Sequence, residues 1–178
     1  MEAPSRPNRL ENLASLATIL VSLLLSVVLI KVFLLPQPNP AASSRPQQPR
    51  AGMTIKQALP GVDWAKNRRT LVLAISTQCH FCTESAPFFQ RIEKERAKDL
   101  KMVAVLPQTV DEGRQYLEGE GVHVDDVKQA QLNAIGVNGT PTLLLVDSKG
   151  TVAQVWEGKL QADQEGAVLA VLNKSASL

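Results

Sequence analysis

The chain has 178 residues, which allows one domain of ordinary size and a short additional segment. Its 19 basic and 17 acidic residues give a formal net charge of +2 at pH 7, so no basic surface of the kind that nucleic-acid binding requires is expected. The two cysteines, Cys79 and Cys82, would close almost no loop if paired. A stabilising disulfide framework closes longer loops, so the pair indicates chemistry rather than cross-linking.

An apolar segment near the N-terminus predicts a single transmembrane anchor over residues 13–35, after an N-terminal tail of residues 1–12. Residues 13–30 carry no charge, and Lys31 lies near one end, where its ammonium can reach the headgroups. A cleaved signal peptide is the alternative, because small residues follow at 41–43. The apolar part of a signal peptide is shorter, about 7–15 residues, which favours the uncleaved anchor.

The charges flanking this anchor do not determine its orientation. Arg6 and Arg9 precede it, whereas Lys31, Arg45 and Arg50 follow it. A dithiol that cycles with a disulfide is most useful in an oxidising compartment. We therefore expect the folded domain to lie outside the cytoplasm, with the N-terminus inside.

The sequence predicts a linker over residues 36–52 and a folded domain over residues 53–178. The linker is rich in proline, serine, glutamine and alanine, which cannot bury enough apolar surface to fold and favour an extended spacer. The domain is long enough to bury a core of its own.

Within the domain, hydrophobic periodicity predicts alternating strands and helices. Strands are expected at Thr70–Ser76, Met102–Leu106, Val122–Val124, Thr142–Val146 and Val152–Trp156, the last two joined by a turn at Asp147–Gly150. Helices are expected after Cys79, at Val110–Glu118, at Val127–Ile135 and at Gln161–Leu172. This order predicts an α/β domain with a central mixed sheet.

Cys79-His80-Phe81-Cys82 follows a predicted buried strand and begins a predicted helix. Unpaired backbone N–H groups and partial positive charge at a helix start favour the thiolate of Cys79. Cys82 lies one turn further along on the same face, where it can attack a mixed disulfide formed at Cys79. His80 adds a possible charge and Phe81 an apolar wall, so both are predicted to tune the site.

Half of a zinc site is the alternative interpretation of this motif. Zinc normally takes four ligands, but the sequence has no second cysteine pair, and His80 and His123 are its only histidines. Redox chemistry is therefore favoured, with no metal and no cofactor besides the Cys79–Cys82 disulfide.

The motif and its surroundings resemble the thioredoxin superfamily, in particular the membrane-anchored TlpA-like (redoxin) proteins of bacterial envelopes. Pro87 stands where that family has a kinking proline, and residues 136–142 resemble its GV-x-G-x-PT segment. The resemblance covers roughly residues 70–172. It implies a thioredoxin-like fold, a cis bond at Thr140–Pro141, and substrate binding by the backbone of Thr140 beside Pro141.

Two positions depart from the thioredoxin pattern. Gln78 replaces the tryptophan before the first cysteine, and Leu73 replaces the buried acid that helps to move the proton of the second thiol. Water or Glu84 remains as a candidate relay. Trp64 and Trp156 are interpreted as core or interface aromatics.

The leading hypothesis is a membrane-tethered thiol–disulfide oxidoreductase of the bacterial inner membrane that faces the periplasm. Its expected partners are thiols or disulfides of envelope proteins and a membrane electron donor or acceptor, and electrons could flow in either direction. A peroxiredoxin is a weaker alternative. Peroxiredoxins have a P-x-x-x-T-x-x-C pattern, but the residue three positions after Thr77 is His80 and not cysteine. A copper metallochaperone would have a wider cysteine spacing and a separate histidine.

Overall fold

The computed structural model of the chain describes residues 18–26 and 49–174. Residues 18–26 are helical and exposed, and they fall within the predicted anchor of residues 13–35. In these two ranges no helix combines the length and the apolar character needed to cross a bilayer. The remainder of the predicted anchor, the tail of residues 1–12 and most of the linker lie outside the described residues, so the anchor stays a prediction.

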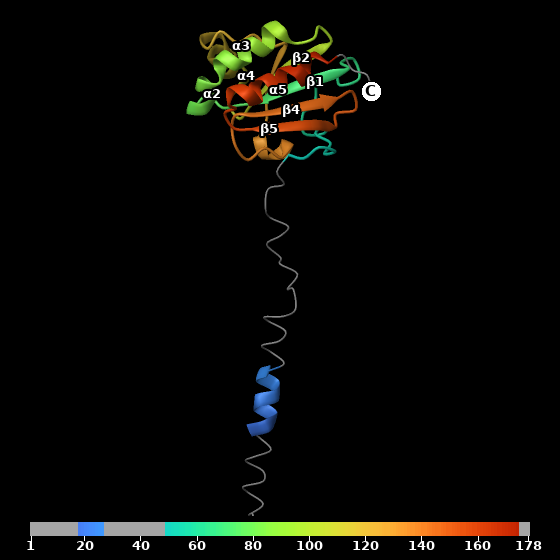
Figure 1. Cartoon of the computed structure of the whole chain (residues 1–178), viewed down its shortest axis with the longest axis vertical. Helices are drawn as coiled ribbons and strands as arrows, with labels where there is room; N and C mark the ends of the chain where they lie inside the picture. The colour runs from blue at the N-terminus through green and yellow to red at the C-terminus, as the bar shows by residue number, and fades with distance from the viewer. Residues whose placement is uncertain (1–17, 27–48, 175–178) are drawn as a thin grey trace, which may run out of the picture. The chain divides into compact units, whose positions relative to one another are not determined.

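A five-stranded mixed sheet forms the centre of the domain (Figure 1), as the sequence predicts. Its strand order is β3-β2-β1-β4-β5. The central strand β1 pairs in parallel with β2 and antiparallel with β4. β3 pairs in parallel with β2, and β5 pairs antiparallel with β4. The strands are β1 (Arg69–Ala74), β2 (Leu100–Leu106), β3 (Asp126–Gln129), β4 (Thr142–Asp147) and β5 (Val152–Glu157).

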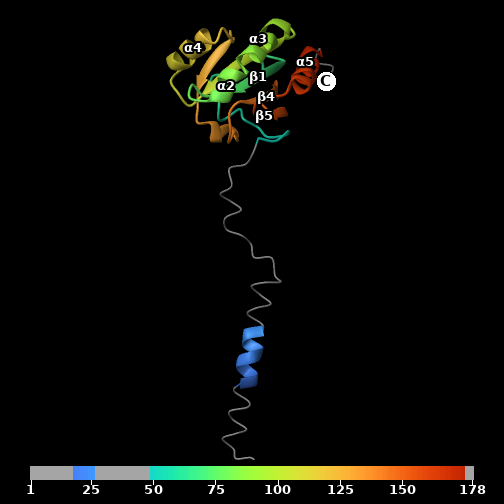
Figure 2. The same cartoon turned by 60° about the vertical axis from the view of Figure 1, so that its left-hand side comes forward.

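Three longer helices cover one face of the sheet, and the segment before β1 together with a 3₁₀ helix covers the other (Figure 2). A short helix, α2, lies at one end of the domain (Figure 1). The helices are α2 (His80–Glu84), α3 (Ala86–Glu95), α4 (Val110–Gly119), η2 (Leu132–Ile135) and α5 (Ala162–Asn173). The result is a layered α/β domain.

Two cores form because side chains alternate between the faces of β1. Leu71 and Leu73 point into the core on the side of α3, α4 and α5, the helix-side core. Val72 and Ala74 point into a second core that includes Trp64, which is 3% exposed as the sequence predicts for a core aromatic. The strand is buried throughout, which explains its continuous apolar run.

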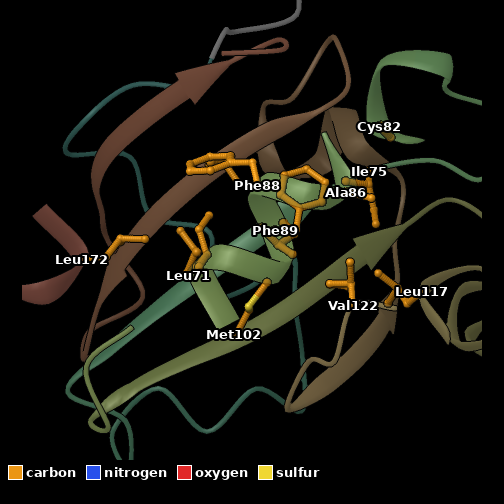
Figure 3. Packing of buried hydrophobic residues seen from close by; sticks show 14 of the residues in the cluster. Leu71, Ile75, Cys82, Ala86, Phe88, Phe89, Met102, Leu117, Val122 and Leu172 are labelled. Atoms are coloured by element: carbon orange, nitrogen blue, oxygen red, sulfur yellow. The ribbon is translucent and has the colours of Figure 1, made fainter. Parts of the chain in front are cut away.

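The single helix expected after Cys79 is divided in two. Ser85 ends α2 and begins α3, and its backbone N–H donates to the carbonyls of Phe81 and Cys82, each at 3.1 Å. Pro87 stands in the first turn of α3, where its missing N–H costs nothing. Phe88 of α3 then packs in the helix-side core (Figure 3).

Two elements predicted between α4 and β4 are wrong. Val122–Val124 is not a strand, and Val127–Ile135 is not a helix but contains most of β3 followed by η2. Parallel pairing with β2 decides this, because it places Val127 opposite Ala104 and buries its side chain in the helix-side core. So short an edge strand has too few residues to show a two-residue period in the sequence.

Candidate active site

Cys79 lies where the chain leaves the central strand and enters α2. It is the N-cap residue of this helix, with extended backbone angles. Its Sγ accepts a hydrogen bond from the backbone N–H of Cys82 at 3.2 Å, in the manner of a capping side chain. The helix start thus supplies a donor to the sulfur, as its position in the sequence predicts.

The loop before β4 meets Cys79 from a distant part of the sequence. The Cys79 thiol donates to the backbone carbonyl of Thr140 at 3.3 Å. The Thr140–Pro141 peptide bond is cis, which confirms the expectation drawn from the resemblance. The carbonyl of Pro141 accepts from the N–H of Gly158 at 2.7 Å, which ties this loop to the end of β5.

Cys82 is fully buried, in contrast to the partly exposed Cys79. It belongs to the helix-side core with Ile75 and Ala86 (Figure 3). Burial, followed by the hydrogen bond to the Cys79 side chain, raises the pKa of the Cys82 thiol from 9.0 to about 12. Hydrogen bonds from the Ser76 backbone and the Thr140 side chain oppose this rise. Cys82 is therefore held as a neutral thiol.

The turn before Cys79 is held by side chains at the ends of two neighbouring strands. The Cys79 N–H donates to the Ser76 carbonyl at 3.1 Å, and the Ser76 Oγ accepts from the Gln78 N–H at 3.3 Å. Gln108, which follows β2, donates from Nε2 to the same Ser76 Oγ at 3.1 Å. Its Oε1 accepts a longer bond, 3.5 Å, from the Thr77 N–H.

His80, Glu84 and Lys159 form a chain of polar contacts at the surface. His80 is exposed, and its Nε2 lies 3.1 Å from a Glu84 oxygen. The other Glu84 oxygen accepts from Lys159 Nζ at 2.9 Å, and this bond lowers the pKa of the Glu84 carboxyl. His80 and Lys159, the two partners of Glu84, are surface groups, so the structure gives no contact through which Glu84 would relay the Cys82 proton.

Phe81 is exposed although it lies between the two cysteines in sequence. Its exposed fraction is 55%, and it is the one large hydrophobic residue that is exposed in residues 49–174. The predicted apolar wall therefore faces the solvent beside Cys79 rather than the core.

The surroundings of Cys82 include one position that the sequence singled out, Leu73, and one side-chain contact that it did not, between Ser76 and Gln108. Leu73, in place of a buried acid, is fully buried in the helix-side core, so no carboxylate approaches Cys82 from that position. The hydrogen bond between Ser76 and Gln108 was not expected from the sequence. Their positions in the sequence could have indicated this contact. Ser76 follows β1 and Gln108 follows β2, and the carboxyl ends of neighbouring parallel strands lie at the same edge of a sheet.

Across residues 18–26 and 49–174, no three histidine, cysteine or acidic side chains are grouped so that they could hold a metal ion. The two cysteines are free thiols. The site as described is thus a dithiol at a helix start, flanked by the Thr140–Pro141 loop.

Comparison with known proteins identifies the family of this domain. The sequence model of thioredoxin-like domains matches residues 64–173. No curated protein shows a significant match to the chain. Among solved structures, a putative thiol:disulfide interchange protein DsbE from Chlorobium tepidum is 25% identical, with a TM-score of 0.54 over 69% of this chain and 98% of that one.

Two further structures share the fold at lower identity. A thiol-disulfide isomerase from Corynebacterium glutamicum is 15% identical, with a TM-score of 0.52 over 71% of this chain and 94% of its own. A secreted disulfide oxidoreductase from Mycobacterium tuberculosis is 12% identical, with a TM-score of 0.50 over 70% and 96%. The chain belongs to the thioredoxin-like family, and within it to the thiol–disulfide oxidoreductases.

Proposed function

We propose that this protein is a membrane-tethered thiol–disulfide oxidoreductase that exchanges disulfides with envelope proteins through Cys79 and Cys82. The observation that carries the proposal is the position of the Cys79 sulfur, 3.2 Å from the N–H of Cys82 at the start of α2 and 3.3 Å from the Thr140 carbonyl. One sulfur is thus reachable and supplied with a donor, while the other is buried one turn away.

In this proposal Cys79 attacks and Cys82 resolves. The Cys79 thiolate attacks a substrate disulfide, forms a mixed disulfide and releases one substrate thiolate. Cys82 loses its proton and attacks the Cys79 sulfur, which releases the second substrate thiolate and leaves the Cys79–Cys82 disulfide. Two electrons pass to the substrate. The reverse sequence oxidises a substrate dithiol, and neither direction needs a cofactor beyond this disulfide.

The Thr140–Pro141 loop is the proposed substrate-binding segment. Its Thr140 carbonyl already accepts from the Cys79 thiol, so a substrate bound at Cys79 would lie against the same backbone. His80 and Phe81 are exposed on α2 and are proposed to tune the site by charge and by apolar contact.

The proposed location is the bacterial inner membrane, with the domain on the periplasmic side and residues 13–35 as the anchor. Support comes from the uncharged segment of residues 13–30 and from the oxidisable pair. The similar fold from Mycobacterium tuberculosis is described as secreted. A membrane electron donor or acceptor would restore the redox state of the dithiol.

Insulin reduction by dithiothreitol tests the chemistry. The domain should accelerate insulin precipitation, and Cys79→Ser should abolish the acceleration without changing the melting temperature appreciably. A wild-type domain that does not accelerate reduction but binds copper stoichiometrically would favour the metallochaperone alternative.

A reporter fusion tests the location. Alkaline phosphatase fused after Leu178 should be active in cells, because the enzyme needs an oxidising compartment to fold. Activity only of a cytoplasmic reporter at the same position would reverse the proposed orientation. Recovery of the fusion in the soluble fraction would argue against the anchor.

A further inference from the structure

Ser76 connects the two cysteines through its backbone. Its carbonyl accepts from the N–H of Cys79 at 3.1 Å. A hydrogen bond from its backbone also acts on Cys82, where it lowers the pKa of a thiol that burial raises. A shift of this residue therefore changes the surroundings of both thiols, and for Cys82 it removes a donor that an emerging thiolate needs.

Gln108 is the side chain that fixes Ser76 from outside the cysteine loop. It follows β2, and its Nε2 donates to the Ser76 Oγ at 3.1 Å across a sequence separation of 32 residues. Its Oε1 lies 3.5 Å from the N–H of Thr77. One amide thus spans two adjacent residues of the turn, and both side chains, Ser76 and Gln108, are partly buried.

This support matters because Cys82 has no carboxylate to receive its proton from the position that Leu73 occupies. In a buried site, an N–H donor held in place stabilises a developing thiolate more than a mobile donor, because no reorganisation is needed when the charge appears. The position of the Ser76 backbone therefore bears on how readily Cys82 loses its proton in an apolar environment.

We propose that Gln108 is a positioning residue for the resolving step: its hydrogen bond to the Ser76 side chain holds the turn whose backbone contacts Cys79 and acts on Cys82. The proposal rests on the proposed function, in which Cys82 attacks the mixed disulfide at Cys79. Gln108 acts through Ser76 and not by contact with substrate.

The two steps can be separated with 5,5′-dithiobis(2-nitrobenzoate). Attack by Cys79 releases one thionitrobenzoate, and attack by Cys82 on the resulting mixed disulfide releases a second. Replacing Gln108 by alanine should slow the second release about three- to tenfold, the effect of one lost hydrogen bond, and change the first less than twofold. The pH profile of the second release should move to higher pH.

Gln129 offers a matched control. Its Nε2 donates to the carbonyl of Pro107, the residue before Gln108, at 3.2 Å, but this bond does not involve the cysteine loop. Gln129→Ala should leave both releases unchanged. Ser76→Ala should reproduce the Gln108→Ala effect, and the double variant should be no slower than either single variant.

The proposal is overturned if Gln108→Ala slows the second release no more than Gln129→Ala. It is also overturned if Gln108→Ala slows both releases equally and lowers the melting temperature. A double variant whose second release is slowed by the product of the two single-variant factors would overturn it as well. Should Gln108→Ala not fold, Gln108→Met keeps the size of the side chain without its hydrogen bonds and should show the same slowing. A wild-type domain without a second release would instead refute the proposed function.

Discussion

The assignment of roles to the two cysteines can be tested by alkylation of each thiol alone as a function of pH. In the Cys79→Ser variant only Cys82 remains, and in Cys82→Ser only Cys79. We expect Cys79 to react with iodoacetamide far faster than Cys82 at pH 7. Cys79 is partly exposed at a helix start, whereas Cys82 is fully buried.

The structure sets the size of the effect for Cys82. Its pKa rises from 9.0 to about 12, a rise of about three pH units that is caused chiefly by burial. Each unit changes the thiolate fraction tenfold below the pKa, so Cys82 should carry about a thousandfold less thiolate at pH 7 than an ordinary thiol. Its alkylation rate should rise about tenfold per pH unit and show no plateau below pH 10.

Alkylation in denaturant is the control, because both thiols should then react at the same rate. If the Cys82 rate reaches a plateau near pH 9, or if Cys82 reacts faster than Cys79 in the folded protein, the argument from burial is refuted. The attacking and resolving roles would then have to be exchanged.

Cys82→Ser should accumulate mixed disulfides with partner proteins on non-reducing gels, whereas Cys79→Ser should trap almost none, since only Cys79 is reachable. Ile92→Ala should lower the free energy of unfolding by about 2–5 kcal/mol in urea titrations, because Ile92 is fully buried in the helix-side core; a loss under 1 kcal/mol would contradict that packing. Burial alone would raise the pKa of Asp125, but hydrogen bonds from Arg96 and the Met102 N–H lower it below 3.8. The ionised Asp125 therefore stabilises the fold above pH 3.8, and this stabilisation is lost as the pH falls through the lowered pKa. The urea midpoints of the wild type and Asp125→Asn should differ at pH 7 and converge in acid.

The exposed ring of Phe81 is a candidate contact for substrates in the function proposed above. Residues 49–174 bury their other large hydrophobic side chains at least in part, yet this ring stays 55% exposed beside Cys79. Single exposed apolar residues are ordinary on protein surfaces. In the function proposed above, the ring would contact an apolar residue near the substrate cysteine. His80, Glu84 and Lys159 form a chain of polar contacts at the surface of the same region.

Local sequence signals determined the parts of this protein that depend on neighbouring residues. The apolar run at Thr70–Ser76 predicted the central strand, because a strand buried on both faces has no polar face. The strand-to-helix position of Cys79 predicted the donor at its sulfur, because helix starts leave N–H groups unpaired. The cis bond at Thr140–Pro141 followed from the resemblance of its segment to a known family.

Only the tertiary structure decided the features that depend on residues far apart in the chain. Pairing with β2 made Asp126–Gln129 an edge strand, although its sequence resembled a helix. The Thr140 carbonyl meets Cys79 across 61 positions, and Gln108 meets Ser76 across 32. Periodicity describes the faces of one element at a time. Such contacts arise only when the strand order brings the ends of separate strands to one edge of the sheet.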